Sequence, residues 1–290
     1  MKAAVPMKVT APGAPPTGTM GGRGPGLTLV IDTSGAACAA AVLDGGDERA
    51  RRVVDLGRGH AERVVDLCGE ALGEAGADWG DLSRIAVCVG PGSFTGVRAG
   101  VAAARGFALS LGIPAIGVTT LETIARPEDP AGGPPPPCLV ALDARRGQVY
   151  AQAFGTDREP LDAPVVAEPE AVASALAPGL RDVVGSGAAL VVEALASLGR
   201  PARIGEAAGE PIVEAQPDIG AVGRAALRRA PFPASPEASS PASPETPSQS
   251  AGELAWRAPE PLYLRQADAK PPPPPLAALD APLDAPKAGA

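Results

Sequence analysis

The sequence predicts an α/β fold made of two similar lobes, and three observations support this prediction. Short apolar runs of strand length alternate with longer segments in which apolar residues recur every three or four positions. The order strand, aspartate, turn, strand occurs twice, first from Leu27 and again from Leu139. About 220 residues remain once segments of low complexity are set aside, a length that suits two domains of ordinary size.

Three segments are expected to be disordered because they are rich in Pro, Ala, Gly and small polar residues and lack apolar periodicity. They separate the two lobes and a short segment that is expected to return to the fold. The expected boundaries are an N-terminal extension at 1–26, a first lobe at 27–126, a second lobe at 138–230, an insertion at 231–252, a returning segment at 253–270 and a tail at 271–290.

Tight turns between apolar runs predict a sheet at the start of the first lobe. One run ends at Asp32, and weak alternation at 51–56 indicates an edge strand. From position 60, apolar residues recur at helical spacing. The expected elements are strands at 27–32, 36–43 and 51–56, a helix at 60–75, a strand at 85–89, a helix at 93–111, a strand at 113–118 and a helix at 121–125.

The second lobe begins in the same way, with an apolar run that ends at Asp143. A proline at position 217 stands near an expected helix start, where proline is well tolerated. The expected elements are strands at 139–143 and 148–154, a helix at 170–176, a strand at 183–187, helices at 190–198 and 217–229, and an ordered piece at 256–265.

The formal net charge is −8, and no segment gathers enough Lys and Arg for a nucleic-acid surface. The densest basic stretch is interleaved with acids, so a solvated face is the preferred interpretation over an RNA contact. Its members are Arg49, Arg51, Arg52, Arg58 and Arg63. The sequence has no apolar run of transmembrane length and no signal-peptide pattern, so we expect a soluble, cytoplasmic protein without a membrane partner.

The four cysteines are isolated and lie in apolar contexts without a C-x-x-C spacing. We expect Cys38, Cys68, Cys88 and Cys138 to be small core residues in a reducing compartment, with neither a disulfide framework nor a zinc site.

The most specific string is the glycine-rich turn from Val89 to Arg98. Gly90 and Gly92 allow backbone angles that a side chain would forbid, and Pro91 fixes one dihedral between them. The N–H groups at 93–96 point out of a helix N-terminus, so the turn either holds an anion or caps the helix tightly. In that helix the small residues Gly96, Gly100, Ala104 and Ala108 predict close packing, within the lobe or against a partner.

Five strings together resemble the TsaB family, also called YeaZ, of tRNA threonylcarbamoyladenosine biosynthesis proteins. They are Ile31-Asp32-Thr33-Ser34, His60-Ala61-Glu62, the string at 90–98, Leu142-Asp143-Ala144-Arg145-Arg146-Gly147-Gln148-Val149-Tyr150, and Pro261-Leu262-Tyr263-Leu264-Arg265. The resemblance implies a duplicated two-lobed fold of the actin, sugar-kinase and Hsp70 type (ASKHA).

The resemblance also implies a function as a noncatalytic scaffold. Such a subunit pairs with a TsaD-like catalytic subunit and works with a small TsaE-like ATPase. The complex transfers threonylcarbamoyl to N6 of adenosine 37 in tRNAs that read codons beginning with A, and tRNA is reached only through the complex. The implied partner interface lies on the first-lobe helices, at His60, Val64, Val65, Cys68, Leu72, Val97 and Val101. A homodimer through the same helices is an open alternative.

The residue inventory separates this chain from the catalytic family, whose metal site uses two histidines on one helix. His60 is the only histidine, and Val64 follows it at the spacing of one helical turn. We therefore expect no TsaD-type metal site, no cofactor and no catalytic residues. A helix-terminal or interface role is preferred for His60.

Two aspartates mark places where related ATPases hold phosphates and metal, and a structural role is preferred for both. A vestigial nucleotide site would comprise Asp32, Thr33, Ser34, Gly90, Gly92, Ser93, Thr95 and Gly96. The second-lobe motif is Asp143, Arg145, Arg146 and Tyr150. The alternative function is an ASKHA-type ATPase or phosphotransferase with Asp32 as its metal or base residue, and a peptidase ranks last because no nucleophile and base pair is visible.

Overall fold

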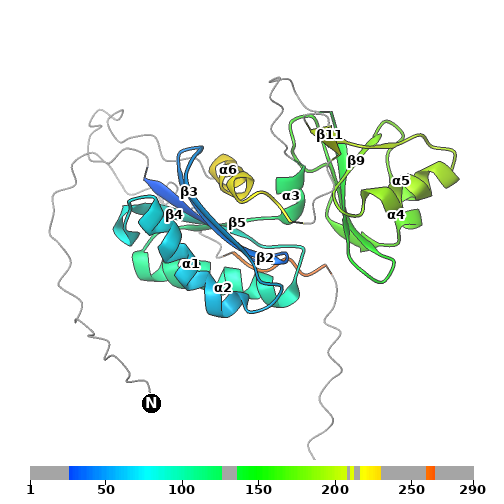
Figure 1. Ribbon diagram of the computed structural model, residues 1–290. Coiled ribbons are helices and arrows are strands. Elements are labelled where there is room, and N and C mark those ends of the chain that lie inside the picture. The colour runs from blue at the N-terminus through cyan, green and yellow to red at the C-terminus, as the bar shows by residue number, and fades with distance from the viewer. Residues whose placement is uncertain (1–25, 126–135, 208–209, 212–215, 230–258, 265–290) are drawn as a thin grey trace, which may run out of the picture. The chain divides into compact units, whose positions relative to one another are not determined.

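The computed structural model describes residues 26–125, 136–207, 210–211, 216–229 and 259–264. They belong to two compact units (Figure 1): unit 1 comprises 1–127 and 216–261, and unit 2 comprises 128–215 and 262–290. The segments expected to be disordered at 1–26, 231–252 and 271–290 lie outside the described residues except for Gly26. Of the returning segment at 253–270, only 259–264 is described.

Unit 1 contains a five-stranded mixed sheet in the order β3-β2-β1-β4-β5. The strands are β1 (Leu27–Asp32), β2 (Ala37–Asp44), β3 (Asp47–Asp55), β4 (Leu82–Cys88) and β5 (Ala115–Val118). β1, β2 and β3 form an antiparallel meander, whereas β4 and β5 run parallel to β1. The predicted edge position of the third strand is confirmed, and this strand is longer than expected.

Helices cover both faces of this sheet (Figure 1). α1 (His60–Glu74) and α2 (Phe94–Leu111) pack on the face that carries Ile31, while α6 (Ile219–Arg229) packs on the opposite face, which carries Val30. Successive residues of a strand point to opposite faces, which explains the near-complete burial of β1. The short helix α3 (Thr120–Ile124) and a 3-10 turn, η1 (Trp79–Asp81), complete unit 1.

The position of α6 corrects the expected second-lobe boundary of 138–230. α6 lies in unit 1, where Ile219 and Val222 join the core formed with Val30 and Val118. The physical reason for this position is that, without α6, the apolar side chains on the Val30 face of the sheet would be exposed to solvent. Unit 1 is therefore built from two separate parts of the chain, and residues 128–215 of unit 2 lie between them in the sequence.

Unit 2 contains a second five-stranded sheet in the order β10-β9-β6-β7-β8. The strands are β6 (Cys138–Asp143), β7 (Val149–Phe154), β8 (Val165–Ala167), β9 (Asp182–Val184) and β10 (Arg203–Ile204). β6, β7 and β8 are antiparallel neighbours, and β9 and β10 run parallel to β6. Strand for strand, this is the arrangement of unit 1, so the predicted duplication is confirmed.

Two helices and a small ribbon accompany the second sheet. α4 (Pro169–Ala175) and α5 (Ala188–Ser197) pack on a core that includes Leu139, Val149 and Val183. β11 (Glu206–Ala207) and β12 (Glu210–Pro211) form a two-stranded ribbon. β8 and the strands from β10 to β12 were not predicted, because each has only two or three residues and leaves no periodicity to read.

The prediction that the four cysteines are core residues is confirmed, since all four are buried. The basic stretch forms ion pairs with acids, with Arg49 on Asp44, Arg51 on Glu48 and Asp218, Arg52 on Glu74, and Arg63 on Glu70. It does not form a single face, because Arg51 and Arg52 pair with acids on opposite sides of the sheet. Among the described helices, none has the length and apolar character required to span a membrane.

Candidate functional site

Asp32 ends the central strand β1 of unit 1 and is fully buried. The backbone N–H of Ser34 donates to Oδ1 of Asp32 at 2.8 Å, so the carboxylate closes the turn that follows the strand. Buried Thr33 and Ser34 complete this turn. The structure thus brings together the first half of the predicted vestigial site, at the carboxyl end of the sheet where α/β proteins commonly bind ligands.

The glycine-rich turn packs directly against the Asp32 turn. The N–H of Ser93 donates to the carbonyl of Ser34 at 2.6 Å, and the hydroxyl of Thr33 donates to the carbonyl of Gly96 at 2.7 Å. A Cβ atom on Gly92 would overlap the carbonyl oxygen of Ser34, and one on Gly96 would overlap that of Thr33. Close backbone packing therefore explains these glycines without a ligand.

Ser93 caps α2, because its hydroxyl accepts a hydrogen bond from the N–H of Gly96 at 3.2 Å. Gly90 has φ = 91°, a left-handed conformation that favours glycine. Further along α2, a Cβ on Gly100 would meet the Thr33 hydroxyl. Of the two interpretations left open for the small residues of α2, packing within the same lobe accounts for Gly96 and Gly100. Thr95 is exposed and lies outside this packing.

Gln216 closes the Asp32 site from the segment that precedes α6. Its Nε2 donates to Oδ2 of Asp32 at 2.9 Å and to the carbonyl of Ala37 at 3.0 Å. Its Oε1 accepts from the N–H of Ala37 at 3.1 Å. The absence of a side chain at Gly35 provides the space for this amide. Both carboxylate oxygens of Asp32 are therefore engaged by the protein itself.

Burial dominates the electrostatics of this site. It raises the pKa of the Asp32 carboxyl above its ordinary value, while the hydrogen bonds from Ser34 and Gln216 act in the opposite direction. The thiol of Cys88 at the end of β4 has its pKa raised to about 12 by burial and by the nearby Asp32 charge. This environment disfavours charge, whereas a magnesium-phosphate site requires exposed, ionised oxygen ligands.

Sequence reasoning missed Gln216 as a member of this site. It lies 184 positions from Asp32 in the chain, and a glutamine in a turn carries no motif of its own. The one indirect signal in the sequence is the helix start that follows Gln216. Asp218 caps α6 there, because its side chain accepts the N–H of Ala221.

The corresponding place in unit 2 is built differently. Oδ1 of Asp143 accepts the N–H of Arg145 at 2.7 Å, and Arg145 and Arg146 adopt positive φ values of 62° and 57° in an exposed turn. The N–H of Asp143 donates to the hydroxyl of Ser186 in the turn before α5. The motif residues Asp143, Arg145 and Arg146 thus share one hairpin, and Tyr150 lies on its second strand, β7.

The predicted partner interface requires a correction. Six of its seven side chains are buried within unit 1: His60, Val64, Cys68, Leu72, Val97 and Val101. They form the inner faces of α1 and α2, because the apolar stripe of an amphipathic helix is used first by its own core. Val65, with half of its surface exposed, is the member that remains available to a partner.

The outer faces of α1 and α2 carry other residues. On α1, Ala61, Val65, Gly69 and Gly73 follow one another at intervals of four, and a Cβ atom on either glycine would meet open space. On α2, Leu109 is 87% exposed. Small side chains on a helix surface permit close approach of another helix, and exposed Val and Leu side chains gain from burial.

Among the described residues, no group of three or more His, Cys, Asp or Glu side chains is placed to hold a metal ion. His60 is the first residue of α1 and is buried, and within the described part of the chain its Nε2 has no hydrogen-bond partner.

Several known proteins are similar to this chain. The family model described as "TsaD: tRNA N6-adenosine threonylcarbamoyltransferase" matches residues 55–196. The tRNA threonylcarbamoyladenosine biosynthesis protein TsaB of Escherichia coli is 36% identical over 122 residues, which cover 42% of this chain and 52% of that protein. Bacillus subtilis TsaB is 51% identical over 72 residues, covering 24% of this chain and 29% of that protein.

A solved structure supports the same assignment over more of the fold. YeaZ from Pseudomonas aeruginosa is 25% identical, with a TM-score of 0.55 over 71% of this chain and 93% of that chain. These similarities support the TsaB (YeaZ) family that the sequence motifs indicate. The expected two-lobed fold class of that family is thereby confirmed. By sequence, the chain spans about half the length of E. coli TsaB and less of B. subtilis TsaB.

Proposed function

We propose that this chain is a noncatalytic subunit in tRNA threonylcarbamoyladenosine biosynthesis and that it pairs with a TsaD-like catalytic subunit. Similarity to TsaB proteins supports the pathway, since the curated relatives carry that role in their names. The proposed partners are a TsaD-like subunit and a TsaE-like ATPase, with tRNA reached through the complex.

The closed Asp32 site is the observation that carries the noncatalytic part of this proposal. An ATPase or phosphotransferase of this fold would need the carboxylate at the end of β1 to reach a metal ion or water. Asp32 is fully buried, and Ser34 and Gln216 occupy its two oxygens. Opening it would require the removal of Gln216 from three hydrogen bonds.

The pairing surface proposed here is the outer face of α1 and α2, with Val65 and Leu109 as its apolar anchors. Both are exposed, and small residues on α1 allow a partner helix to approach. A homodimer through this surface would compete with the TsaD-like subunit.

The test is a binding measurement between the full chain and the TsaD-like subunit of the same organism, by calorimetry and size-exclusion chromatography. Val65→Asp and Leu109→Asp should each weaken the complex at least about tenfold, because each places a charge in a desolvated contact. Leu198→Asp is the matched control, since Leu198 is 51% exposed in unit 2. Unchanged affinity in both unit 1 variants would refute this surface.

A reconstituted assay tests the division of labour. The chain alone should transfer no threonylcarbamoyl group to tRNA, and it should be required when the TsaD-like and TsaE-like subunits are present. Turnover of ATP or tRNA by the isolated chain would refute the noncatalytic assignment.

A further inference from the structure

One edge of the unit 1 sheet is formed by β3, a strand of nine residues. Edge strands are usually short or covered, because their free backbone groups can pair with another strand. The other edges of the two five-stranded sheets are shorter, with four residues in β5, three in β8 and two in β10. Of these edges, β3 is the one best suited to accept a further strand.

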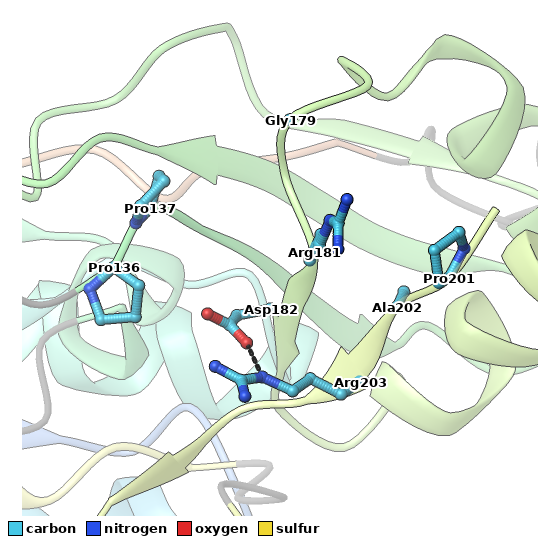
Figure 2. Close-up of a pocket in the computed structure, with 8 residues that line it drawn as sticks. All are labelled: Pro136, Pro137, Gly179, Arg181, Asp182, Pro201, Ala202 and Arg203. Atoms are coloured by element: carbon cyan, nitrogen blue, oxygen red, sulfur yellow. Dashed lines mark hydrogen bonds and ion pairs between the residues drawn. The ribbon is translucent and has the colours of Figure 1, made fainter.

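The edges of unit 2 show how such a sheet is closed to further pairing. β8, which takes the place of β3 in the duplicated sheet, ends after three residues. At the opposite edge, Nε of Arg203 in β10 donates to Oδ1 of Asp182 on the adjacent strand at 2.6 Å, as the dashed line in Figure 2 marks. Short strands and charged side chains both hinder the addition of a strand at an edge.

The backbone groups of Arg51, Val53 and Asp55 point away from β2, toward the open edge. The N–H of Leu56 donates to the carbonyl of Ala36 at 3.2 Å, and this pair continues the register between β2 and β3. Hydrogen-bonded and non-hydrogen-bonded pairs alternate along an antiparallel ladder, so every second residue before Leu56 bonds to β2. The residues between them present both N–H and C=O at the edge.

Ala37 gives an independent check of this alternation. It lies opposite Asp55, but its N–H and C=O both bond to the side-chain amide of Gln216, at 3.1 and 3.0 Å. The backbone groups of Asp55 therefore have no partner in β2. The register shift of this strand pair lies farther along, between Val42 and Leu43, so the three outward-facing residues belong to one regular section.

The Val53 side chain lies at the centre of this section and is 52% exposed. It is on the same face of the sheet as Ala39, which lies opposite it and belongs to the core beneath α6. α6 packs over β1, β2, β4 and β5, so the Val53 side chain on the outermost strand stays exposed. An apolar side chain at this place gains free energy when a partner buries it.

Opposite charges flank Val53 on the same face of the strand. Arg51 precedes it by two positions, Asp55 follows it by two, and both are exposed. Nε and Nη2 of Arg51 donate to Glu48, and its Nη1 lies 2.7 Å from Oδ2 of Asp218. These contacts use three of the five N–H groups of the guanidinium, so a further acid can be accommodated.

We propose that β3 binds β3 of a second copy of this chain, antiparallel and with Val53 on the two-fold axis. The two unit 1 sheets then form one continuous sheet. Val53 lies opposite its own copy, Arg51 lies opposite Asp55 of the other copy, and each such pair exchanges two backbone hydrogen bonds. Opposite charges directly across two strands are stabilising, and the symmetry provides this contact twice.

The charges on β3 favour this register over its neighbours. A two-fold axis at Arg51, Arg52 or Asp55 would place that residue opposite its own copy, and like charges directly opposite are destabilising. An axis at Val54 would place Val53 opposite Asp55 and would pair no opposite charges. The pattern of charges about Val53 is therefore complementary to itself, which selects a second copy of the chain as the partner.

The β3 edge is separate from the pairing surface proposed above. α1 and α2 cover one face of the sheet, whereas β3 lies at its side. The inference therefore does not rest on the proposed function, and a dimer through β3 leaves the outer face of α1 and α2 open to a TsaD-like subunit.

Sedimentation velocity of the full chain over a range of concentrations measures the association. We expect a reversible monomer–dimer equilibrium, and an excess of the TsaD-like subunit should leave the dimer intact. A chain that stays monomeric at about 1 mM would overturn the proposal. Dissociation of the dimer by the TsaD-like subunit would also overturn it, because that result would place the contact on α1 and α2.

Disulfide cross-linking tests the position of the two-fold axis. The Cα atoms of a hydrogen-bonded antiparallel pair lie about 5.5 Å apart, within the range that a disulfide spans. With oxidised glutathione, Val53→Cys should form a covalent dimer at least about tenfold faster than Val65→Cys, because the paired thiols react within one complex. Val65 is the matched control, since it is 50% exposed and lies on α1. Equal rates, or a faster reaction of Val65→Cys, would contradict the β3 contact.

Complementary charge reversals test the register. Asp55→Arg should weaken the dimer about tenfold, because both symmetric charge pairs become repulsive, and Arg51→Asp should weaken it similarly. An equimolar mixture of the two variants should dimerise again, since each opposed pair then joins an arginine to an aspartate. If circular dichroism shows both variants folded and the mixture still does not dimerise, the register is refuted.

Discussion

Nε2 of Gln216 lies 2.9 Å from Oδ2 of Asp32, although 184 positions separate the two residues in the chain. This contact joins the end of the central strand β1 to the segment that returns from unit 2 and leads into α6. A single amide therefore both satisfies a buried carboxylate and fixes the entry of the last helix of unit 1.

Gln216→Ala should lower the free energy of unfolding by about 2 kcal/mol, because it leaves one oxygen of a buried carboxylate without a donor. Urea denaturation of the full chain measures the change. The double variant with Asp32→Asn should lose less than the sum of the two single variants, since each single change breaks the same contact. Additive losses would mean that the two side chains do not stabilise one another.

The pH dependence of stability reports the charge state of Asp32. Burial raises its folded-state pKa above the ordinary value of 3.8. Between pH 3.8 and the raised folded-state pKa, Asp32 holds a proton in the folded protein that it has released in the unfolded chain. The free energy of unfolding therefore falls as the pH rises through this window. The stability advantage of the wild-type chain over Asp32→Asn should therefore be largest below pH 3.8 and should decrease as the pH rises. Urea denaturation of both proteins across this range measures the trend, and an advantage that increases with pH would contradict it.

Two glycines of α2 offer a matched pair of substitutions. Gly96→Ala should destabilise unit 1 by about 2 to 3 kcal/mol, because the new methyl group overlaps the Thr33 carbonyl oxygen. Gly106→Ala introduces the same methyl group where nothing lies within 4 Å, and it should stabilise the helix by about 0.5 to 1 kcal/mol. Thermal unfolding of both variants tests the contrast. Equal effects would show that the glycine turn is not closely packed against the Asp32 turn.

The ion pair between Glu122 and Arg229 ties α3 to the end of α6. Nη2 of Arg229 lies 2.6 Å from Oε2 of Glu122, whose side chain is 5% exposed, and Nη1 donates to the carbonyl of Gly117 at 2.6 Å. Glu122→Gln should cost about 2 kcal/mol, because it removes a charge from hydrogen bonds that Arg229 and Thr119 donate.

Glu70→Gln is the control for this ion pair, since Glu70 is 46% exposed and pairs with Arg63 at the surface. It should cost far less than Glu122→Gln, because solvent screens an exposed ion pair. Urea denaturation of both variants provides the comparison. A similar loss in the two proteins would contradict the anchoring role of Glu122.

Much of the fold was predictable because its signals are local. The strand at 27–32 has the predicted bounds, and those of α1 and α2 are within one residue of prediction. Apolar periodicity and the Ser93 cap depend only on residues that are close together in the sequence. The lobe that receives α6 was not predictable in this way, because an amphipathic helix does not specify which sheet it covers. Periodicity likewise identified the apolar stripe on α1. It did not reveal that these side chains are buried against the sheet of the same unit and not exposed for a partner.

The candidate site likewise contains residues that local motifs predict and one residue that only the structure reveals. Asp32, Ser34, Gly92 and Gly96 were named from motifs, and the structure brings them together. Gln216 was not named, because its role depends on a contact across nearly the whole chain. The motif gave the location of the site, and the residue that closes it required the structure.

The split composition of unit 1 has a consequence for biosynthesis. A ribosome releases the five strands of the first sheet long before α6, and residues 128–215 of unit 2 emerge in between. Until residues 219–229 leave the exit tunnel, the side of the sheet that holds Val30 and Val118 has no helix to cover it. This apolar face of the sheet stays uncovered throughout synthesis of the intervening residues. Premature termination before α6 therefore yields an aggregation-prone fragment rather than a shorter working protein.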